Sequence, residues 1–600
     1  MKYLLRRLAI CAAVASAPGS VSAQQVLQPQ SQDDFSRVLS PGLLQPGLTP
    51  EVSKQLQREA ARNCFDPDSF QRALPQIPPD QLRPLPCAPQ SAFDRFVMWN
   101  QIALDTTAID HAPPPPGVNT NPGLQHLGPH RSSRVMAIVH VAMFDAINMA
   151  SRFNGKNPSQ PNYRFETYSP NLPLPKRAVS IDLAITYAAG ETLKALYREQ
   201  APVIAEFMRL DEMAILNKKD GKTPFYSEAR DLGTAAARAI LDRRKNDGSA
   251  HVEPQVGQDG FPLADGPGQW RPDPVSNIIT ALGGRWGSVE PFVIRNVPTF
   301  RPPAPPSPGD PRYAKDFEEV RRLGGEVTQR TRTDRTEEET IIGIFWAYDG
   351  TAFLCAPPRL YNQVIRQIVE QKTRDERSKD QDPKLLNYAR LFALANLAMA
   401  DAAIAAWDAK YHYRYWRPVV GIRAAATDGN AATEPDYYWR ALGAPASNSV
   451  RGPNFTPPFP AYPSGHATFG GALFEVLRNF YAEGTAFTFR SDEYNGINRP
   501  VGSSTPRPEI VRSFANFRAA EDENARSRIY IGVHWQFDAD AGIAQGNQVG
   551  SFVVANALRC LTNDGKPRDC RPDSGLDVLQ RFLISTEKRV ITTPLNAAPQ

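Results

Sequence analysis

The run Arg134-Val-Met-Ala-Ile-Val-His-Val-Ala-Met-Phe-Asp-Ala-Ile-Asn148 decides the fold class of this chain. Its apolar side chains fall on most sides of a helix, which is typical of a helix buried on all its faces. Further helical patterns begin near Phe93 and recur at 176–208, 226–245, 341–348, 358–373, 383–411, 466–482, 508–533 and 537–559. Hairpin signals are scarce. The sequence therefore predicts an all-α protein.

The length of the chain predicts more than one bundle. Six hundred residues exceed what one ordinary hydrophobic core supports, so we expect two helical bundles packed together. The Pro- and Gly-rich stretch 250–312 suits a connection between them, because such a segment cannot continue a helix. Ala142-Met143-x-Asp145-Ala146 recurs as Ala398-Met399-x-Asp401-Ala402, which favours two similar halves.

The N-terminus has the features of a secretory signal. A charged start with Lys2, Arg6 and Arg7 precedes the short apolar run 8–15 and the small residues 21–23. We expect cleavage near Ala23 and export to the periplasm or the medium, with no membrane-spanning helix. The predicted organisation is a signal peptide at 1–23, an extended arm at 24–95, an N-terminal helical bundle and connector at 96–312, a C-terminal helical bundle at 313–560 and a tail at 561–600.

Charge and cysteine content exclude some classes. The net charge of +5 includes the cations of the signal, so the exported chain does not have a nucleic-acid-binding balance. Export permits disulfides, and we expect the pairs Cys64–Cys87 and Cys560–Cys570 with Cys355 free, the alternative being that all are reduced. No cysteine–histidine cluster in the sequence indicates zinc.

Three segments of the second half bring together groups that suit a tetrahedral oxyanion. They are Lys410-x6-Arg417-Pro418, Pro463-Ser464-Gly465-His466 and Ser527-Arg528-x5-His534-x3-Asp538. Together they supply three cations, a hydroxyl, a glycine, two imidazoles and a carboxylate, and phosphate and vanadate are ligands that need such a set. Each segment alone has a plainer interpretation as a solvated cationic stripe, a capped helix or a helix salt bridge. Their joint occurrence favours an oxyanion site.

Spacing predicts the local structure of the first two segments. Lys410 and Arg417 are seven residues apart, which places them two helical turns apart on one face. Pro418 is expected to end that helix. Ser464 and Gly465 precede a helix-forming run, so the free N–H groups of a helix N-terminus would face the anion, and the glycine would allow close approach.

In the third segment, His534 and Asp538 have the i,i+4 spacing that lets two side chains touch on a helix. A carboxylate against one ring nitrogen fixes the tautomer and leaves the other nitrogen as ligand or nucleophile. The remaining histidines, at 111, 126, 130, 140, 251 and 412, are assigned no ligand role, and His140 is expected in the core.

The pattern K-x6-RP, PSGH, SR-x5-H-x3-D resembles that of the superfamily joining vanadium-dependent haloperoxidases with bacterial acid and lipid phosphatases. Beyond these motifs, the chain resembles the fungal-type vanadium chloroperoxidases in the stretches 346–350, 357–362, 457–472, 493–499 and 531–538. The gap from His466 to Ser527 is longer than is usual in the superfamily, so 483–507 is predicted to be a family-specific insertion.

The resemblance implies specific roles and places the vanadate site in the C-terminal bundle. Vanadate would bond to His534, and its oxygens would be held by Lys410, Arg417, Ser464, Gly465 and Arg528. The catalytic groups would be His534, His466 as acid–base group and Lys410 as the cation that polarises the reacting oxygen. Asp349 would pair with Arg528, Asp538 would support the site from behind, and Trp407 and Phe459 would form the halide environment.

The expected function is a vanadate-dependent, chloroperoxidase-like haloperoxidase without haem. It would use hydrogen peroxide to oxidise chloride, bromide or both to hypohalous acid, which halogenates a small organic acceptor, with phosphate as a competitor of vanadate. The alternative is a secreted acid phosphatase in which His534 becomes a phosphohistidine and His466 protonates the leaving group. A non-enzymatic oxyanion-binding protein is a third class, and the intact His466 argues against it.

Overall fold

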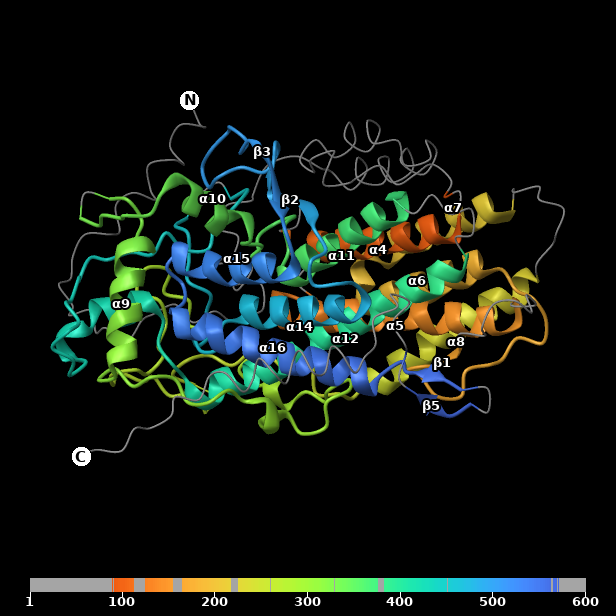
Figure 1. Ribbon diagram of the computed structural model, residues 1–600, viewed down its shortest axis with the longest axis horizontal. Coiled ribbons are helices and arrows are strands. Elements are labelled where there is room, and N and C mark those ends of the chain that lie inside the picture. The colour runs from red at the N-terminus through yellow and green to blue at the C-terminus, as the bar shows by residue number, and fades with distance from the viewer. Residues whose placement is uncertain are drawn as a thin grey trace, which may run out of the picture.

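The computed structural model describes residues 89, 91–112, 125–154, 164–216, 225–258, 260–328, 330–375, 382–449, 452–562, 565–568 and 570 (Figure 1). The predicted signal peptide, nearly all of the arm and the predicted pair Cys64–Cys87 lie outside these residues.

The first half is helical, as predicted. Its helices are α4 (Ala92–Asp110), α5 (Gly128–Asn154), α6 (Ile181–Leu196), α7 (Ala201–Leu216) and α8 (Tyr226–Arg244), with the 3-10 turn η1 (Arg198–Gln200). Within 250–312 the described residues form only the short turns η2 (Trp286–Ser288) and η3 (Val297–Phe300) before α9 (Pro311–Leu323) begins. The predicted start of the first bundle at residue 96 is four residues late, because Ser91 and Asp94 form a capping box that starts α4 at Ala92.

The remaining described helices all lie in the second half. They are α10 (Glu337–Phe345), α11 (Pro357–Asp375), α12 (Asp382–Tyr413), α13 (Pro418–Arg423), α14 (Gly465–Phe480), α15 (Phe517–Tyr530) and α16 (Gln536–Asn556), with the turn η4 (Ala425–Thr427). A capping box begins α10: Thr336 Oγ1 accepts from Glu339 N, and a Glu339 carboxylate oxygen accepts from Thr336 N. The helix-dominated fold class is confirmed.

One expected helix is wrong over its first part. The stretch 508–533 begins as strand β3 (Glu509–Phe514), which pairs antiparallel with β2 (Phe487–Asn495), and becomes helical only at Phe517. The pairing buries Phe487 against Phe514, with ring centroids 5.1 Å apart. A cross-strand aromatic pair of this kind stabilises a hairpin. The sequence pattern does not predict this strand, because its partner lies far along the chain and leaves no local helix-breaking signal.

The two bundles share one apolar cluster. In each half three helices contact one another, α5, α6 and α8 in the first and α12, α14 and α16 in the second, and α5 packs along α12 (Figure 1). The cluster of buried apolar side chains runs without a break from Phe96 in α4 to Val553 in α16. The length argument therefore predicted the two bundles but not their shared core.

Two described helices are long and apolar enough to cross a membrane, namely 128–152 within α5 and 384–413 within α12. The apolar windows of both are wholly buried inside the protein, at the contact between the two bundles. Packing in a core accounts for their apolar character.

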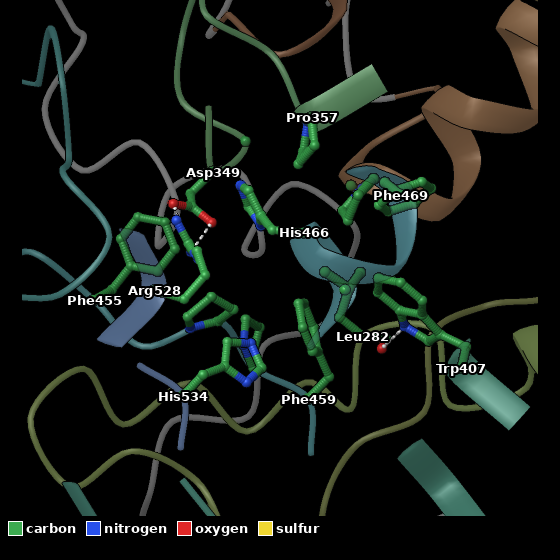
Figure 2. A pocket seen from close by; sticks show the side chains of 16 residues that line it. Leu282, Asp349, Pro357, Trp407, Phe455, Phe459, His466, Phe469, Arg528 and His534 are labelled. Carbon is green, nitrogen blue, oxygen red and sulfur yellow. Dashed lines mark hydrogen bonds and ion pairs between the residues drawn. The ribbon is translucent and has the colours of Figure 1, made fainter. Parts of the chain in front are cut away.

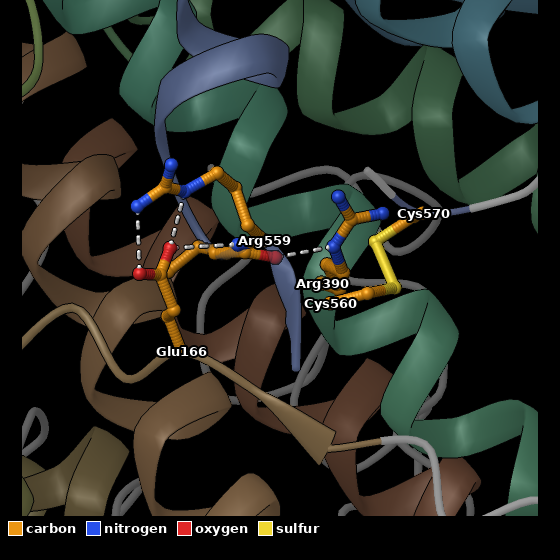
Figure 3. The surroundings of a disulfide bond; sticks show 6 residues. Glu166, Arg390, Arg559, Cys560 and Cys570 are labelled. Atoms are coloured by element: carbon orange, nitrogen blue, oxygen red, sulfur yellow. Dashed lines mark hydrogen bonds and ion pairs between the residues drawn. A yellow bond between two sulfur atoms is a disulfide. The ribbon is translucent and has the colours of Figure 1, made fainter. Parts of the chain in front are cut away.

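The end of the described chain is joined to the first half (Figure 3). Strand β4 (Cys560–Leu561) pairs with β1 (Arg164–Phe165) and with β5 (Pro567–Arg568). The predicted disulfide Cys560–Cys570 is confirmed, and Cys355 is free and buried, as predicted. Beside the disulfide, Arg559 Nε donates to Glu166 at 2.8 Å, so the C-terminal strand contacts the N-terminal bundle.

Candidate active site

The three motif segments meet around one pocket, which Figure 2 shows from close by. The pocket has a volume of about 510 Å³ when the solvent-filled space at its opening is included. Its polar lining is Asp349, His466, Arg528 and His534. The apolar lining comprises Leu282, Trp407, Phe455, Phe459, Phe469 and the prolines 129, 357, 457 and 458. A polar floor under apolar walls suits a small anion together with an uncharged or weakly hydrated substrate.

His534 is held by partners on both ring nitrogens. Nδ1 lies 2.9 Å from Asp538 Oδ2, and Nε2 lies 2.9 Å from Arg417 Nη1. A guanidinium can only donate, so Nε2 must be the acceptor and Nδ1–H must donate to Asp538. Burial, then the nearby Arg417 and Lys410, hold the pKa of His534 well below its usual range. The imidazole is therefore neutral, with its lone pair on Nε2.

Asp538 is also fixed from the backbone. Its Oδ2 accepts from Trp535 N at 3.0 Å, and its own carbonyl accepts from Ser464 N at 2.8 Å. Burial raises the pKa of Asp538, against the opposite effects of the Trp535 N–H and of the cations Lys410 and Arg417. Asp538 thus joins the segment before α16, through its carboxylate, to the start of α14, through its backbone carbonyl.

The two arginines of the site keep buried N–H groups without a protein partner. Arg417 donates through Nε to Phe459 O at 2.9 Å and through Nη1 to Val533 O at 2.7 Å. Arg528 donates through Nη2 to both oxygens of Asp349, at 2.7 and 2.9 Å. In the described part of the chain, nothing accepts from Arg417 Nη2 or from Nε and Nη1 of Arg528. Buried donors of this kind are costly unless a ligand satisfies them.

Asp349 orients Arg528 as the family resemblance implied. Burial raises the pKa of the Asp349 carboxyl, while Arg528 acts to lower it. Three buried basic groups, Lys410, Arg417 and Arg528, stand against two buried acidic groups, Asp349 and Asp538, and this excess of basic groups favours an anionic ligand.

Ser464 and Gly465 begin α14, as predicted. Ser464 is the N-cap, and its Oγ accepts from Ala467 N at 3.5 Å, so its hydroxyl hydrogen can still donate to a ligand. Gly465 lines the pocket, and a Cβ placed there would come within 3.6 Å of the Trp407 ring. The glycine therefore keeps open the space between the helix start and the indole.

His466 follows directly and also lines the pocket. Its Nε2 lies 2.6 Å from Ala347 O, and a carbonyl can only accept, so the proton is on Nε2 and the lone pair on Nδ1. Burial, and then Arg528, lower the pKa of His466 well below its usual range. Its carbonyl accepts from Tyr361 OH and Asn524 Nδ2, which fixes the backbone of this turn.

Lys410 is buried beside the pocket but is directed at backbone carbonyls. Its ammonium donates to Pro460 O, Ala461 O and Pro463 O at 2.9, 2.9 and 2.5 Å. An ammonium has three donors, and all of them are used here. In this structure Lys410 shapes the loop that leads into Ser464, and the predicted contact of Lys410 with the ligand stays a prediction.

The expected helical placement of two motif segments is wrong. Helix α12 ends at Tyr413, Arg414 adopts a φ of 50°, and Arg417 is the N-cap of α13, so Pro418 begins a helix instead of ending one. Proline is well suited to this first helical position because its N–H would be unpaired there. His534 likewise precedes α16, and the predicted contact with Asp538 is made from the loop.

The aromatic pair Trp407 and Phe459 forms one wall, with ring centroids 5.0 Å apart. Sequence reasoning missed the part of the wall that the first half supplies, which comprises Gly128, Pro129 and Leu282. Leu282 O accepts from Trp407 Nε1 at 3.0 Å, the interaction drawn in Figure 2. Gly128 and Pro129 are the first residues of α5 and Leu282 lies in the connector, and only the turn signals around them could have drawn attention to either segment.

Comparison with known proteins shows which proteins this chain resembles in sequence and in fold. Residues 390–563 match the family described as the VCPO second helical-bundle domain. A curated relative, the vanadium chloroperoxidase of Curvularia inaequalis, is 40% identical over 234 residues, which cover 35% of this chain and 37% of that enzyme. The chain thus spans little more than a third of the length of this relative. The resemblance to the vanadium haloperoxidases is confirmed.

Two solved structures show the same fold over most of the chain. The crystal structure of the first bacterial vanadium-dependent iodoperoxidase is 22% identical, with a TM-score of 0.59, and covers 79% of this chain and 99% of its own. That of a holo-type bacterial vanadium-dependent chloroperoxidase is 18% identical, with a TM-score of 0.50, and covers 71% and 92%. The helical fold therefore extends well beyond the matched domain.

Proposed function

We propose that this protein is a vanadate-dependent haloperoxidase that uses hydrogen peroxide to oxidise chloride, bromide or both to hypohalous acid. One observation carries the proposal: three buried guanidinium nitrogens that have no acceptor among the described residues accompany an imidazole lone pair on His534 Nε2. A tetrahedral oxyanion that also accepts a bond from nitrogen would satisfy all of these groups at once.

Vanadate fits the residues present. His534 Nε2 would be its nitrogen ligand, and Arg417, Arg528, Ser464 and the N–H groups at the start of α14 would hold its oxygens. When bound, vanadate supplies a Lewis-acidic centre that activates peroxide towards halide without changing its own oxidation state. Arg417 Nη1 now donates to His534 Nε2, so binding requires the guanidinium to pass this donor to the ligand.

The protein's own groups manage charge and protons. Nδ1 of His466 carries a lone pair and can take a proton from the incoming peroxide, and Ala347 O accepts from the other nitrogen and holds the ring. Asp349 keeps Arg528 directed at the site, so that its two other donors face developing negative charge.

The apolar walls support oxidation of a halide near Trp407 and Phe459. The relatives include proteins described as a chloroperoxidase and as an iodoperoxidase, and we propose chloride or bromide here because an aromatic pair faces the site. Hypohalous acid would then halogenate a small organic acceptor. Export after cleavage near Ala23 is part of the proposal and rests on the N-terminal sequence.

The test is halogenation of monochlorodimedone by metal-stripped protein with peroxide and either chloride or bromide, before and after addition of orthovanadate. We expect loss of the dione only with vanadate, and competition by phosphate. His534→Ala should reduce turnover and vanadate retention by about 100-fold or more, because the nitrogen ligand is lost. His412→Ala, an exposed histidine, is the matched control and should leave both unchanged.

Two outcomes would overturn the proposal. One is absence of turnover with both halides together with vanadate-inhibited cleavage of a phosphate monoester, which would make the protein a phosphatase acting through His534. The other is full activity and vanadate retention in His534→Ala.

A further inference from the structure

A glutamate–histidine pair from the first half lies directly behind the aromatic wall of the site. His130 is at the start of α5 and Glu253 is in the connector, and both are outside the three motif segments. His130 Nε2 lies 3.2 Å from Glu253 Oε1. The His130 ring faces Trp407 with centroids 5.3 Å apart and a tilt of 33°, and its other neighbour is Trp286 at 4.6 Å.

Glu253 connects three parts of the chain. Its Oε1 accepts from His130 and from Arg131, whose Nη2 is 2.8 Å away. Its Oε2 accepts from Gly283 N at 2.6 Å. His130 and Arg131 hold the pKa of Glu253 down at about 2 in spite of burial, so the group is an ionised carboxylate and His130 must donate to it.

The loop held by Glu253 in turn determines where the indole of Trp407 lies. Leu282 O accepts from Trp407 Nε1 at 3.0 Å, and Leu282 N donates to Pro458 O at 3.0 Å. Gly283 has a φ of 72°, and a Cβ there would come within 2.1 Å of the Trp407 ring. Only a glycine fits this close approach, so the loop lies in direct contact with the indole.

Trp407 is thus held by contacts from both halves. His130 and the Leu282–Gly283 loop contact it from the first half, and Phe459 contacts it from the second. Leu282, Trp407, Pro458 and Phe459 all line the pocket, so a shift of the loop would move several wall residues together.

We propose that Glu253 and His130 are positioning residues that hold Trp407 in the pocket wall beside the halide. We propose further that this pair sets the affinity of the enzyme for the halide that it oxidises. The inference rests on the proposed haloperoxidase function and deepens it. Neither residue lines the pocket, so each acts through Trp407 and the Leu282–Gly283 loop.

The experiment compares Glu253→Ala, Glu253→Gln and His130→Leu with Glu212→Gln. Glu212 is a matched control, since it is also a first-half glutamate bound to an arginine, Arg230, but lies away from the pocket. The readouts are the orthovanadate dissociation constant, kcat and KM for bromide, and the tryptophan fluorescence and near-ultraviolet circular dichroism, each also recorded in a Trp407→Phe background.

For Glu253→Ala and His130→Leu we expect the halide KM to rise about tenfold, with kcat and the vanadate dissociation constant within about twofold. Glu253→Gln keeps an oxygen for Gly283 N and should show a smaller rise, of about threefold. The tryptophan spectra should change in the wild-type background, and the change should be smaller in the Trp407→Phe background, where Trp286 is the indole that still contacts His130. Glu212→Gln should match the wild type in every readout.

Two results would overturn the inference. One is an unchanged KM with unchanged spectra. The other is a fall in kcat and in vanadate affinity together with a change in KM in folded Glu253→Gln, which would indicate a general role in folding. If Glu253→Ala does not fold, Glu253→Gln and His130→Leu decide the question. If the wild type oxidises no halide, the proposed function fails, and the spectra still test whether the pair holds Trp407.

Discussion

At the residue scale, His534 shows how neighbours select one form of a side chain. A free imidazole has two neutral tautomers, and here a donor-only guanidinium on one nitrogen and a carboxylate on the other leave one of them. Because burial and nearby cations hold the pKa of His534 well below its usual range, the lone pair on Nε2 is available at neutral pH. Asp538 is the partner that makes this arrangement stable.

Replacing Asp538 with asparagine should therefore weaken vanadate binding. The amide oxygen can still accept from His534 Nδ1–H and from Trp535 N, because both bonds end on Oδ2, but the amide cannot carry the negative charge of a carboxylate behind His534. We expect the dissociation constant for orthovanadate to rise about 10- to 100-fold. Equilibrium dialysis with orthovanadate measures this directly. Asp540→Asn, an exposed change two residues away, should have no effect, and equal affinities of the two variants would contradict the role of Asp538.

Much of the candidate site could be predicted from the sequence, because its residues are concentrated in three short segments. His534, Arg528 and Ser464 meet where the spacing and the resemblance placed them. The part that could not be predicted depends on contacts between distant segments. The ammonium of Lys410 bonds to carbonyls of residues 460–463, and Leu282 reaches the pocket from the connector.

At the element scale, the errors of prediction lie where a helix begins or ends. Local patterns identified most of the long helices but not α9, and they missed that Arg414 turns the chain with a positive φ before Pro418 starts a new helix. Such a turn is decided by packing of the following segment, not by the residue type, since arginine has no preference for positive φ. The same holds for β3, whose aromatic partner is more than twenty residues away.

The packing of α4 against α5 gives a prediction on pH. His140 in α5 accepts from Asn100 in α4 and donates to Met136 O, and burial lowers its pKa to about 4. The unfolded chain binds a proton at His140 below pH of about 6.5, whereas the folded protein does not until about pH 4. Stability that His140 contributes at neutral pH is therefore lost as pH falls through this window.

His140→Gln removes this titration. The free energy of unfolding of the wild type minus that of the variant should fall by about 2 kcal/mol between pH 7.5 and pH 5, because the unfolded state of the wild type alone gains the proton. Urea unfolding at the two pH values, followed by circular dichroism, measures the difference. The exposed His412→Gln keeps His140, serves as the control, and should lose stability between the two pH values as the wild type does. A difference for His140→Gln that does not change with pH would show that His140 is not buried in its neutral form.

At the scale of the whole molecule, the two halves repeat one arrangement. The triangle of α5, α6 and α8 corresponds to that of α12, α14 and α16, and the first helices of the two triangles pack together. The sequence contained a trace of this in the repeated Ala-Met-x-Asp-Ala. In the structure Asp145 and Asp401 have the same role, because each accepts hydrogen bonds from backbone N–H groups of a segment that crosses its helix.

This equivalence leads to a prediction about both halves. Asp145 accepts from the N–H groups of Tyr168 and Ser169, and Asp401 accepts from those of Phe292, Val293 and Ile294. Alanine at either position leaves these buried donors without a partner, at about 1 kcal/mol or more each. We expect Asp145→Ala to lower the free energy of unfolding by about 2 kcal/mol and Asp401→Ala by about 3 kcal/mol.

The control is Asp408→Ala, which removes an aspartate of α12 whose partly exposed pair with Arg301 should contribute less than about 1 kcal/mol. Urea midpoints of the three variants and of the double variant Asp145→Ala/Asp401→Ala provide the comparison. The loss in the double variant should differ from the sum of the single losses, because the two held segments contact each other: Tyr168 OH donates to Phe292 O at 2.8 Å. A loss at Asp401 no larger than that at Asp408 would mean that the segment 292–294 is held by its apolar contacts alone. The repeated motif would then reflect the packing of small residues between α5 and α12, and not a duplicated anchor.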